Sequence, residues 1–397
     1  MIGQAQFLSW PHDDRGHGST VTDADILIIG AGISGAALAW QLAGARRVVV
    51  LEGERTPSHH STGRSAAMQT VYAGKPMIQA ASRASEAFLA QPPEGFAEVP
   101  LLTPRGVLRL TDAAGRAALA AAHAAALAQG RPVTLLTRAQ MLERGYPVAE
   151  RVVLGLLDAA PSDIDVDALH QGFLRGAQRK GAQIRLGQKV TEMKRAHGRW
   201  WIMAGQEALT ADVVVNAAGA FSDEVAAMAG AEPIRVTPKR RTIAVVPTPE
   251  GMAAADWPLM ADADFSFYMK PEASGLLVSP SDAEPQAAGD AHPEELDVAI
   301  AIDRMQQWLD IPVRRVSHSW AGLRSFAEDE DPLIGFDSRA EGFFWYAGQG
   351  GFGVQSAPAL SCAAAHILLG KALPEHLRRA GLSPERLCPD RLIKEVT

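Results

Sequence analysis

Long apolar runs, cysteine and basic charge are all scarce in this sequence of 397 residues. No stretch approaches the roughly 18 consecutive apolar residues that a membrane-spanning helix needs, so we expect no transmembrane segment. The two cysteines, Cys362 and Cys388, stand in no metal-ligand spacing, which argues against a disulfide framework and favours a reducing compartment. The formal net charge of -7 excludes the basic excess of a nucleic-acid-binding protein. The sequence also shows no Ser–His–Asp pattern, no metal cluster and no P-loop.

The composition is otherwise that of a soluble globular enzyme, with 47% hydrophobic and 21% charged residues. The length allows about two or three domains. Residues 1–22 have no periodicity and lack the basic start and apolar centre of a secretion signal, so we interpret them as a flexible extension. These features predict a cytoplasmic protein and leave peripheral membrane association open.

A strand–turn–helix–strand pattern occupies residues 23–52. An apolar run at 26–29 predicts a buried parallel strand, residues 36–42 predict a helix, and a second apolar run at 48–51 ends on Glu52. Between the first strand and the helix, three residues have the spacing G-x-G-x-x-G: Gly30, Gly32 and Gly35.

This pattern is typical of a dinucleotide site. Glycines at this spacing let the backbone approach a pyrophosphate, whose charge lies at the positive end of the following helix. Glu52 is placed to accept hydrogen bonds from the ribose hydroxyls. The pattern alone does not distinguish NAD from FAD, and a strand–turn–helix unit without a ligand remains the alternative.

Three later segments add to this prediction. The polar loop 58–68 offers N–H groups and hydroxyls to a flat polar ring, although a surface turn is the alternative. The small-residue turn 216–219 either closes over the adenosine half of a dinucleotide or serves sheet packing. Residues 348–360 place four glycines at a further strand-to-helix turn, where the helix N-terminus favours negative charge. By contrast, we interpret Asp163, Asp165 and Asp167 as helix-start acids, since the glycine and final glutamate of a calcium loop are missing.

Seven motifs extend over almost the whole chain. They are HSTGRSAA at 60–67, DIDVDALHQGFLRG at 163–176, VVNAAGA at 214–220, PKRR at 238–241, SFYMKP at 266–271, WAGLRSF at 320–326 and QGGFG at 349–353. With these motifs the chain resembles the D-amino-acid oxidase superfamily of FAD-dependent amine oxidoreductases, and within it most closely the bacterial D-arginine dehydrogenases. The resemblance implies FAD rather than NAD, because the first and last motifs embrace the isoalloxazine ring in that family.

The resemblance also implies site residues. The substrate carboxylate would be held by Arg241, Arg324 and Tyr268, since a planar guanidinium matches a carboxylate in two parallel hydrogen bonds. The carbonyl of Gly351 would accept a hydrogen bond from the substrate amine, which completes the predicted catalytic set.

For the cofactor, the resemblance places Ser65 and Ala66 at the reactive face of the flavin and the backbone of Val190 at the adenine. No cysteine or histidine stands where the family attaches flavin covalently, so non-covalent FAD is expected. The full predicted cofactor set is Gly30, Gly32, Gly35, Glu52, Ser61, Thr62, Arg64, Ser65, Ala66, Val190, Gly219, Gly350, Gly351, Gly353 and Gln355.

The chain departs from the D-arginine enzymes in its substrate pocket. Met68 replaces a histidine, Ala73 replaces a tyrosine although Tyr72 is adjacent, and Val107 lies near the position of a glutamate that binds the cationic side chain. An unpaired buried cation is strongly unfavourable. We therefore expect Met68, Tyr72 and Val107 to line a pocket for a neutral or less basic side chain, or for a cation held by another residue.

The expected fold is α/β, with an FAD-binding Rossmann-like domain and an antiparallel-sheet substrate domain interleaved in sequence. We assign residues 23–75, 151–230 and 318–397 to the FAD-binding domain and residues 76–150 and 231–317 to the substrate domain. Helices are expected at 76–91, 112–130, 168–179 and 293–309.

The expected reaction is oxidative deamination of a D-amino acid by hydride transfer from the α carbon to FAD. Leu277 stands where sarcosine-oxidase-like members place a lysine that promotes reaction with oxygen, so we expect electrons to pass to a quinone or another acceptor. Two alternatives remain. One is oxidation of an N-methyl or cyclic amino acid or a 2-hydroxy acid, and the other is a non-catalytic flavoprotein that serves as a binding partner.

Overall fold

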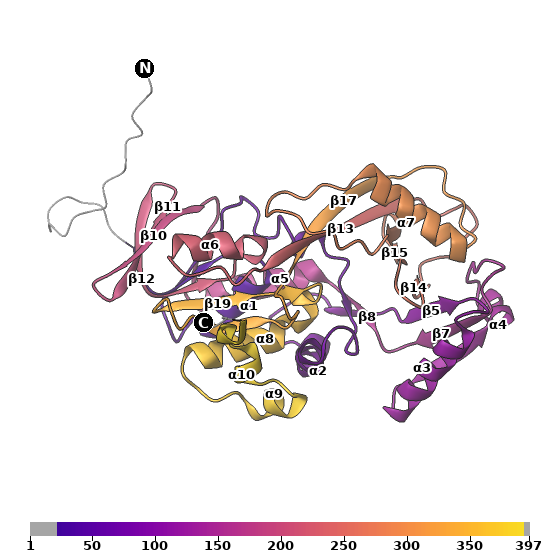
Figure 1. The fold of residues 1–397 in the computed structure, drawn as a ribbon, viewed down its shortest axis with the longest axis horizontal. Helices are drawn as coiled ribbons and strands as arrows, with labels where there is room; N and C mark the ends of the chain where they lie inside the picture. The colour runs from indigo at the N-terminus through magenta and orange to yellow at the C-terminus, as the bar shows by residue number, and fades with distance from the viewer. Residues whose placement is uncertain (1–21, 393–397) are drawn as a thin grey trace, which may run out of the picture.

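The structure is a computed structural model that describes residues 22–392. The expected extension at residues 1–22 therefore lies outside the described residues, except for Thr22, which begins the first strand. Three sheets organise the chain, and the two large ones occupy opposite ends of the longest axis in Figure 1.

The first large sheet is built on parallel strands. Its order is β10 (Val190–Ala196), β11 (Arg199–Ala204), β12 (Glu207–Asn216), β1 (Thr22–Ile29), β2 (Val48–Leu51) and β9 (Gln183–Arg185), with β19 (Phe343–Ala347) beside β12 and β18 (Leu333–Phe336) beside β19. Ile29 is paired with both Leu51 and Asn216, so the carboxyl ends of the three central strands meet at one edge. Ligands of open α/β sheets bind at such an edge.

Four helices cover this sheet and form one apolar core with it. They are α1 (Ile33–Leu42), α2 (Pro76–Ala90), α5 (Val166–Arg179) and α8 (Gly353–Leu368). The close packing of α1 on β1 requires Gly35, because a Cβ at this position would lie 1.9 Å from the carbonyl oxygen of Gly30.

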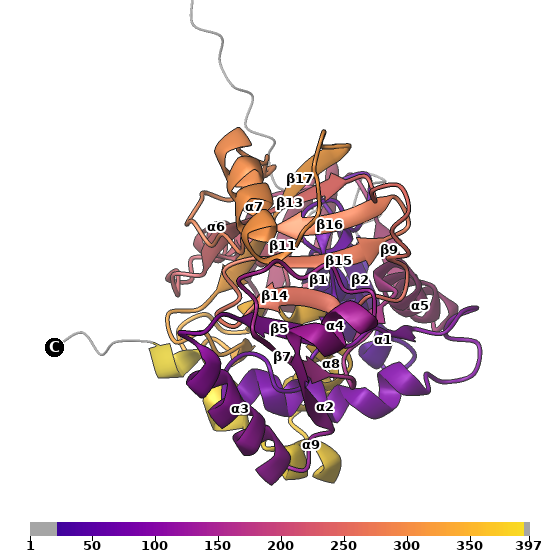
Figure 2. The same cartoon turned by 90° about the vertical axis from the view of Figure 1, so that its right-hand side faces the viewer.

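The second large sheet has nine strands, and its neighbours are antiparallel except for the pair β14 and β5. The order is β20 (Gln349–Gly350), β17 (His318–Phe326), β13 (Thr237–Val246), β16 (Gly275–Ser279), β15 (Tyr268–Glu272), β14 (Leu259–Asp262), β5 (Val107–Thr111), β7 (Leu154–Asp158) and β6 (Val133–Thr137). Helices α7 (Glu295–Trp308) and α4 (Arg138–Glu143) contribute to the apolar core on one face, and α3 (Arg116–Ala128) packs at the β6–β7 end (Figure 2).

The remaining elements are short. A small sheet has the order β3 (Met68–Gln69), β8 (Ser162–Ile164) and β4 (Leu102–Pro104). The helical segments are η1 (Thr62–Arg64), η2 (Gly219–Phe221), α6 (Ser222–Met228), α9 (Glu375–Ala380), α10 (Pro384–Leu387) and η3 (Pro389–Leu392). Within residues 22–392, no helix combines the length and apolarity needed to cross a bilayer.

This architecture confirms the α/β fold class and the four expected helices, which appear as α2, α3, α5 and α7. Four elements pack with a different sheet from the one implied by the domain assignment from sequence. Helix α2 packs against α8 in the core of the parallel sheet, although residues 76–90 were assigned to the substrate domain. Strands β7, β17 and β20 belong to the nine-stranded sheet, although their residues were assigned to the FAD-binding domain.

We interpreted Asp163, Asp165 and Asp167 as acids at the start of a helix, and this is right for two of the three. Asp165 caps the helix by accepting from the N–H of Ala168, and Asp167 lies in the first turn. It is wrong for Asp163, which belongs to β8 and accepts hydrogen bonds from Arg105 Nε at 2.7 Å and Lys270 Nζ at 2.9 Å.

Candidate functional site

A cavity of about 870 Å³ lies between the two large sheets. One wall is the edge where β1, β2 and β12 end, together with the loop at residues 57–73. The opposite wall is one face of the nine-stranded sheet. A volume in this range is typical of sites for cofactors and small molecules.

The glycine-rich turn after β1 lines one end of the cavity. Gly30 has a φ of +102°, and a Cβ there would lie 2.5 Å from the carbonyl oxygen of Ala217. Gly32 is the N-cap of α1, whose first backbone N–H, that of Ile33, donates to Thr62 Oγ1 at 3.0 Å. The helix thus directs its positive end toward the cavity, where an anion is favoured.

Glu52 lies beside this turn at the end of β2. Its Oε2 accepts from the backbone N–H of Ala31 at 2.8 Å, and its Oε1 accepts from that of Glu54 at 3.0 Å. These two bonds fix the carboxylate, and each oxygen retains a lone pair because a carboxylate has about four acceptor positions. Glu52 can therefore still accept hydrogen bonds from a pair of hydroxyls.

The polar loop that follows is tied to β17. Ser61 Oγ donates to the carbonyl of Leu323, and Arg64 Nη1 donates to the carbonyls of Ala291 and Ala321 at 2.8 and 2.9 Å. Because these side chains hold the loop in place, the backbone at Ser65 and Ala66 forms part of the cavity wall.

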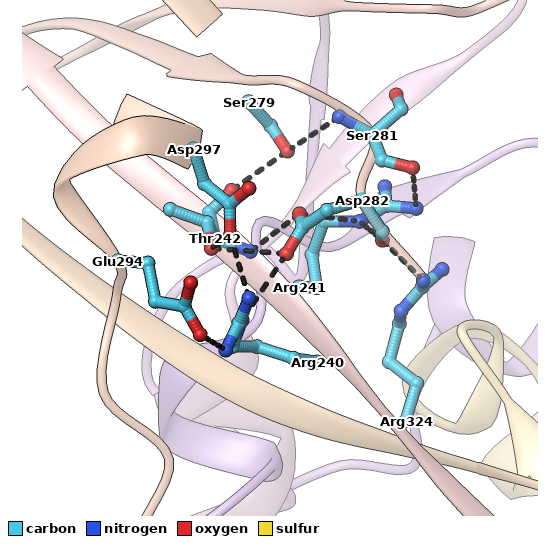
Figure 3. Close-up of polar contacts among 9 residues, drawn as sticks. All are labelled: Arg240, Arg241, Thr242, Ser279, Ser281, Asp282, Glu294, Asp297 and Arg324. Carbon is cyan, nitrogen blue, oxygen red and sulfur yellow. Dashed lines mark hydrogen bonds and ion pairs between the residues drawn. The ribbon is translucent and has the colours of Figure 1, made fainter. Parts of the chain in front are cut away.

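Two arginines converge on the opposite wall. Arg241 Nε and Nη2 donate to the carbonyls of Asp282 and Ser281 at 2.9 and 3.1 Å, and Arg324 Nη2 donates to the same carbonyl of Asp282 at 3.0 Å (Figure 3). Ser281 has a φ of +55°, a strained conformation for a residue other than glycine. The strained turn thus aims its carbonyl groups at the arginine pair.

The strand period explains why Arg241 faces the cavity and its neighbour does not. Arg240 points to the other side of β13, where it forms ion pairs with Glu294 and Asp297 of the α7 region (Figure 3). Successive side chains alternate across a sheet. Arg241 therefore lies on the cavity face, with its Cζ 5.7 Å from the ring centroid of Tyr268.

The environment of Arg324 changes its ionisation. Burial, and secondly the charge of Arg241, lower the pKa of Arg324 from its usual value to about 10. It is still protonated at neutral pH. A Cβ on Gly351 would lie 3.3 Å from Arg324 Cδ and Nη1, so a side chain at this position would crowd the guanidinium. The carboxylate of Asp282 lies 3.7 Å from Arg241 Nε and is the one acid beside the two arginines in the described residues, so the pair still favours a second anion.

Comparison with known proteins assigns the family. The sequence profile of the family described as "DAO: FAD dependent oxidoreductase" matches residues 25–367. The chain belongs to this family. FAD is therefore its cofactor, and oxidation–reduction is its chemistry.

Individual curated relatives are distant in sequence. Human mitochondrial dimethylglycine dehydrogenase is 25% identical over 66% of this chain, and the match spans only 31% of that protein. FAD-dependent oxidoreductase domain-containing protein 1 of Xenopus laevis is 25% identical over 87% of this chain and 79% of its own length.

Solved structures share the fold at lower identity. Glycine oxidase from Bacillus cereus has a TM-score of 0.76 at 19% identity and covers 91% of this chain and 98% of its own. L-proline dehydrogenase from P. horikoshii has the same TM-score and identity, covering 94% and 98%. None of these matches shows a particular closeness to D-arginine dehydrogenase.

The residues of the cavity fit FAD. The open turn at Gly30, the N-terminus of α1 and the carboxylate of Glu52 provide for a pyrophosphate and a ribose, as the family requires. Five further buried polar atoms on residues that line the cavity have no partner within residues 22–392: His60 Nδ1, Arg131 Nε, Gln188 Oε1, Arg324 Nε and Gln349 Nε2. Buried polar groups in native proteins are nearly always paired, so these atoms indicate a polar ligand.

Most of the residues predicted for the site line this one cavity. They are Gly30, Gly32, Glu52, Ser61, Thr62, Arg64, Ser65, Ala66, Met68, Tyr72, Val107, Val190, Gly219, Arg241, Tyr268, Arg324, Gly350, Gly351 and Gly353. The structure shows that these residues line the cavity, and their individual roles remain predictions.

Two predicted cofactor residues do not line the cavity. Gly35 acts in packing, as described above. Gln355 is buried, and its side chain is engaged by the protein: its Oε1 accepts from the N–H of Thr70 at 2.7 Å, and its Nε2 donates to Ser82 Oγ at 2.9 Å. Its amide therefore braces the loop after Met68 against α2.

The sequence interpretation missed two groups of residues. Ser281 and Asp282 position the arginine pair, and the motif SPSD directly after an apolar strand was the available signal. Arg109 and Arg131 also line the cavity, at the far end of the nine-stranded sheet. The signal for Arg109 was a charged residue inside the apolar run VLRLT.

Proposed function

We propose that this chain is an FAD-dependent dehydrogenase that oxidises the Cα–N bond of a D-amino acid. The observation that supports this most strongly is the pair formed by Arg241 and Arg324 on a buried wall beside Tyr268. Guanidinium groups shielded from water bind a carboxylate strongly and fix its plane.

In this proposal the protein binds and orients. Arg241 and Arg324 take the substrate carboxylate, Tyr268 adds a third hydrogen bond, and the carbonyl of Gly351 accepts from the amine. Holding both ends of the amino acid fixes the direction of the Cα–H bond, and this positioning is the main catalytic contribution of the chain.

The cofactor would be held by the Gly30 turn, Glu52, Val190 and the loop at Ser65 and Ala66. When bound, FAD supplies a two-electron oxidant that accepts a hydride. The substrate amine must be neutral, so that its lone pair forms the C=N bond of the imino acid as the hydride leaves Cα. Water then converts the imino acid to a 2-oxo acid and ammonia.

The electron acceptor is proposed from the residues near the predicted flavin face. Leu277 packs in one apolar cluster with Ile243 and Val245, against Ala66 and Tyr268, which leaves no ammonium at its position. The buried Lys270 is paired with Asp163 and Glu272 and does not line the cavity. A dehydrogenase that reacts slowly with oxygen and passes electrons to a quinone or similar carrier fits this arrangement. Rapid peroxide formation in air would contradict it.

The test is anaerobic bleaching of the flavin absorbance by both enantiomers of a panel of amino acids. We expect D enantiomers to reduce the flavin and Arg241→Met to slow this reduction. The exposed Arg144 provides a control, because Arg144→Gln also removes one positive charge, at a residue that does not line the cavity. Failure of every amino acid to bleach the flavin would refute the proposal.

A second candidate function is oxidation of an N-methylated or cyclic amino acid. It is favoured by the names of the relatives, which include dimethylglycine dehydrogenase, L-proline dehydrogenase and an iminodiacetate oxidase. Sarcosine, dimethylglycine and both proline enantiomers therefore belong in the same panel, and faster bleaching by one of them would favour this candidate.

A further inference from the structure

A second cationic group lies in the same cavity, away from the arginine pair. Arg109 and Arg131 both line it, together with the carboxylate of Asp158. Arg131 Nη2 is paired with Asp158 Oδ2, and the other oxygen of Asp158 accepts from the N–H of Ala160 at 3.1 Å. The side chain of Arg109 forms no hydrogen bond or ion pair within residues 22–392, and only its backbone is paired in the sheet.

The register of the sheet places Arg109 on the wall that carries the substrate-binding residues. Arg109 is paired with Ala261 of β14, and Ala261 is paired with Tyr268 of β15. Residues paired across neighbouring strands point to the same face. Arg109 therefore stands in one row with Tyr268, two strands away, which is a backbone separation of about 10 Å.

The charges at this end of the cavity do not balance. Two guanidinium groups face one carboxylate, which is already engaged by Arg131 and a backbone N–H. Burial is the main cause that lowers the pKa of Arg109, and the charge of Arg131 adds to it. Arg131 also has a buried Nε without a partner, and its Cζ lies 4.0 Å above the ring of Tyr72.

Other carboxylates that line the cavity do not compensate Arg109. Glu52, Glu54 and Glu224 stand at the nucleotide end, where Glu52 is held by Ala31 and Glu224 lies in the first turn of α6 after β12. Glu86 also lines the cavity, but the charge that acts on its pKa is that of Arg83. Asp158 is the acid that acts on the pKa of Arg109.

We propose that the substrate carries a second anionic group, a carboxylate at the end of its side chain, and that Arg109 with Arg131 binds it. This inference rests on the proposed function and names the substrate class for the same site. The α-carboxylate would lie at Arg241 and Arg324, and the side chain would extend past Tyr268 and Val107 along the wall toward Arg109. An unpaired guanidinium beside an apolar stretch of the cavity wall favours a substrate side chain that is apolar in its middle and anionic at its end.

The experiment compares pairs of anionic and neutral substrates of equal carbon-chain length, in anaerobic flavin reduction and in steady-state kinetics with a dye acceptor. The pairs are D-glutamate with D-glutamine and D-2-aminoadipate with D-norleucine, and D-lysine is the cationic member. We expect kcat/KM to be about ten- to a hundred-fold higher for the anionic member of each pair, and lowest for D-lysine, since hydrogen bonds to charged groups carry this range.

The variant Arg109→Gln should bring the anionic-to-neutral ratio of kcat/KM close to one. The matched control Arg144→Gln, also an arginine-to-glutamine change but on an exposed position of the surface, should leave the ratio as it is. The variant Arg109→Lys keeps the positive charge and should retain part of the preference for anionic substrates. A merely structural role of Arg109 would not predict this result.

The outcomes separate this inference from the function on which it rests. If no amino acid reduces the flavin, the proposed function fails. If neutral D-amino acids reduce it and the anionic members do so no faster, the function stands and the inference is overturned. An unchanged ratio in Arg109→Gln that still holds its flavin would overturn it as well.

Discussion

Replacement of Arg324 by methionine tests the central contact of the site. Methionine keeps much of the side-chain length and removes the charge and the donors. A bidentate pair of charge-assisted hydrogen bonds carries ~3–6 kcal/mol, so kcat/KM for the best substrate should fall about a hundred- to ten-thousand-fold. We expect replacement of Arg324 to lower kcat/KM more than replacement of Arg241, because burial lowers the pKa of Arg324.

The assay is stopped-flow reduction of the flavin without oxygen, with substrate varied through saturation. The absorbance spectrum must first show that Arg324→Met binds as much FAD as the unchanged protein, since the substitution also removes a donor from the carbonyl of Asp282. Arg324→Lys should recover part of the loss by restoring the charge without the planar fork. A fall of less than about threefold in Arg324→Met with full flavin content would refute the carboxylate-binding role.

Three further predictions concern the cofactor and the pH dependence. Gly30→Ala should lose most of the bound FAD, because the φ of +102° at Gly30 and the 2.5 Å approach to the carbonyl oxygen of Ala217 leave no place for a Cβ. The control is Ala36→Gly, a substitution inside α1. Equal flavin content in the two variants would contradict the role of the turn. Acid precipitation should release all FAD into the supernatant; flavin retained in the pellet would point to covalent attachment, with His59 and His60 as nucleophiles on the cavity wall. The rate of flavin reduction should rise with pH as the substrate amine loses its proton. Substrate binding should weaken above about pH 10, where Arg324 of the substrate-free protein loses its charge. Binding that stays constant well beyond this pH would contradict the lowered pKa of Arg324.

The nucleotide end of the site was predictable because its signals are local. Strand, glycines, helix and acid follow one another within residues 23–52, and each signal depends on its neighbours in the chain. Arg241, Tyr268 and Arg324 were reachable through the resemblance, although three separate strands bring them together. Composition or periodicity alone would not have grouped them.

The errors and omissions have a common physical cause. The sequence did not show that Gln355 lies outside the cavity or that Asp163 lies outside the helix start, because the partners of their side chains, Ser82 and Lys270, are far away in sequence. Arg109 was missed because its place beside Tyr268 depends on the parallel pairing of β14 with β5, which joins segments about 150 residues apart in an otherwise antiparallel sheet. Sequence patterns specify local conformation, whereas sheet register over such separations is a property of the whole fold.

The alternation of Arg240 and Arg241 on β13 makes catalytic competence depend on sheet alignment. Strands β13 and β17 are paired continuously from Thr237 to Val245. A shift by a single position would turn every side chain over, so that the arginine now neutralised by Glu294 and Asp297 would enter the cavity and its neighbour would leave it. A one-residue deletion at the start of this strand would then yield a chain that still carries both guanidinium groups and yet presents the wrong one to the ligand.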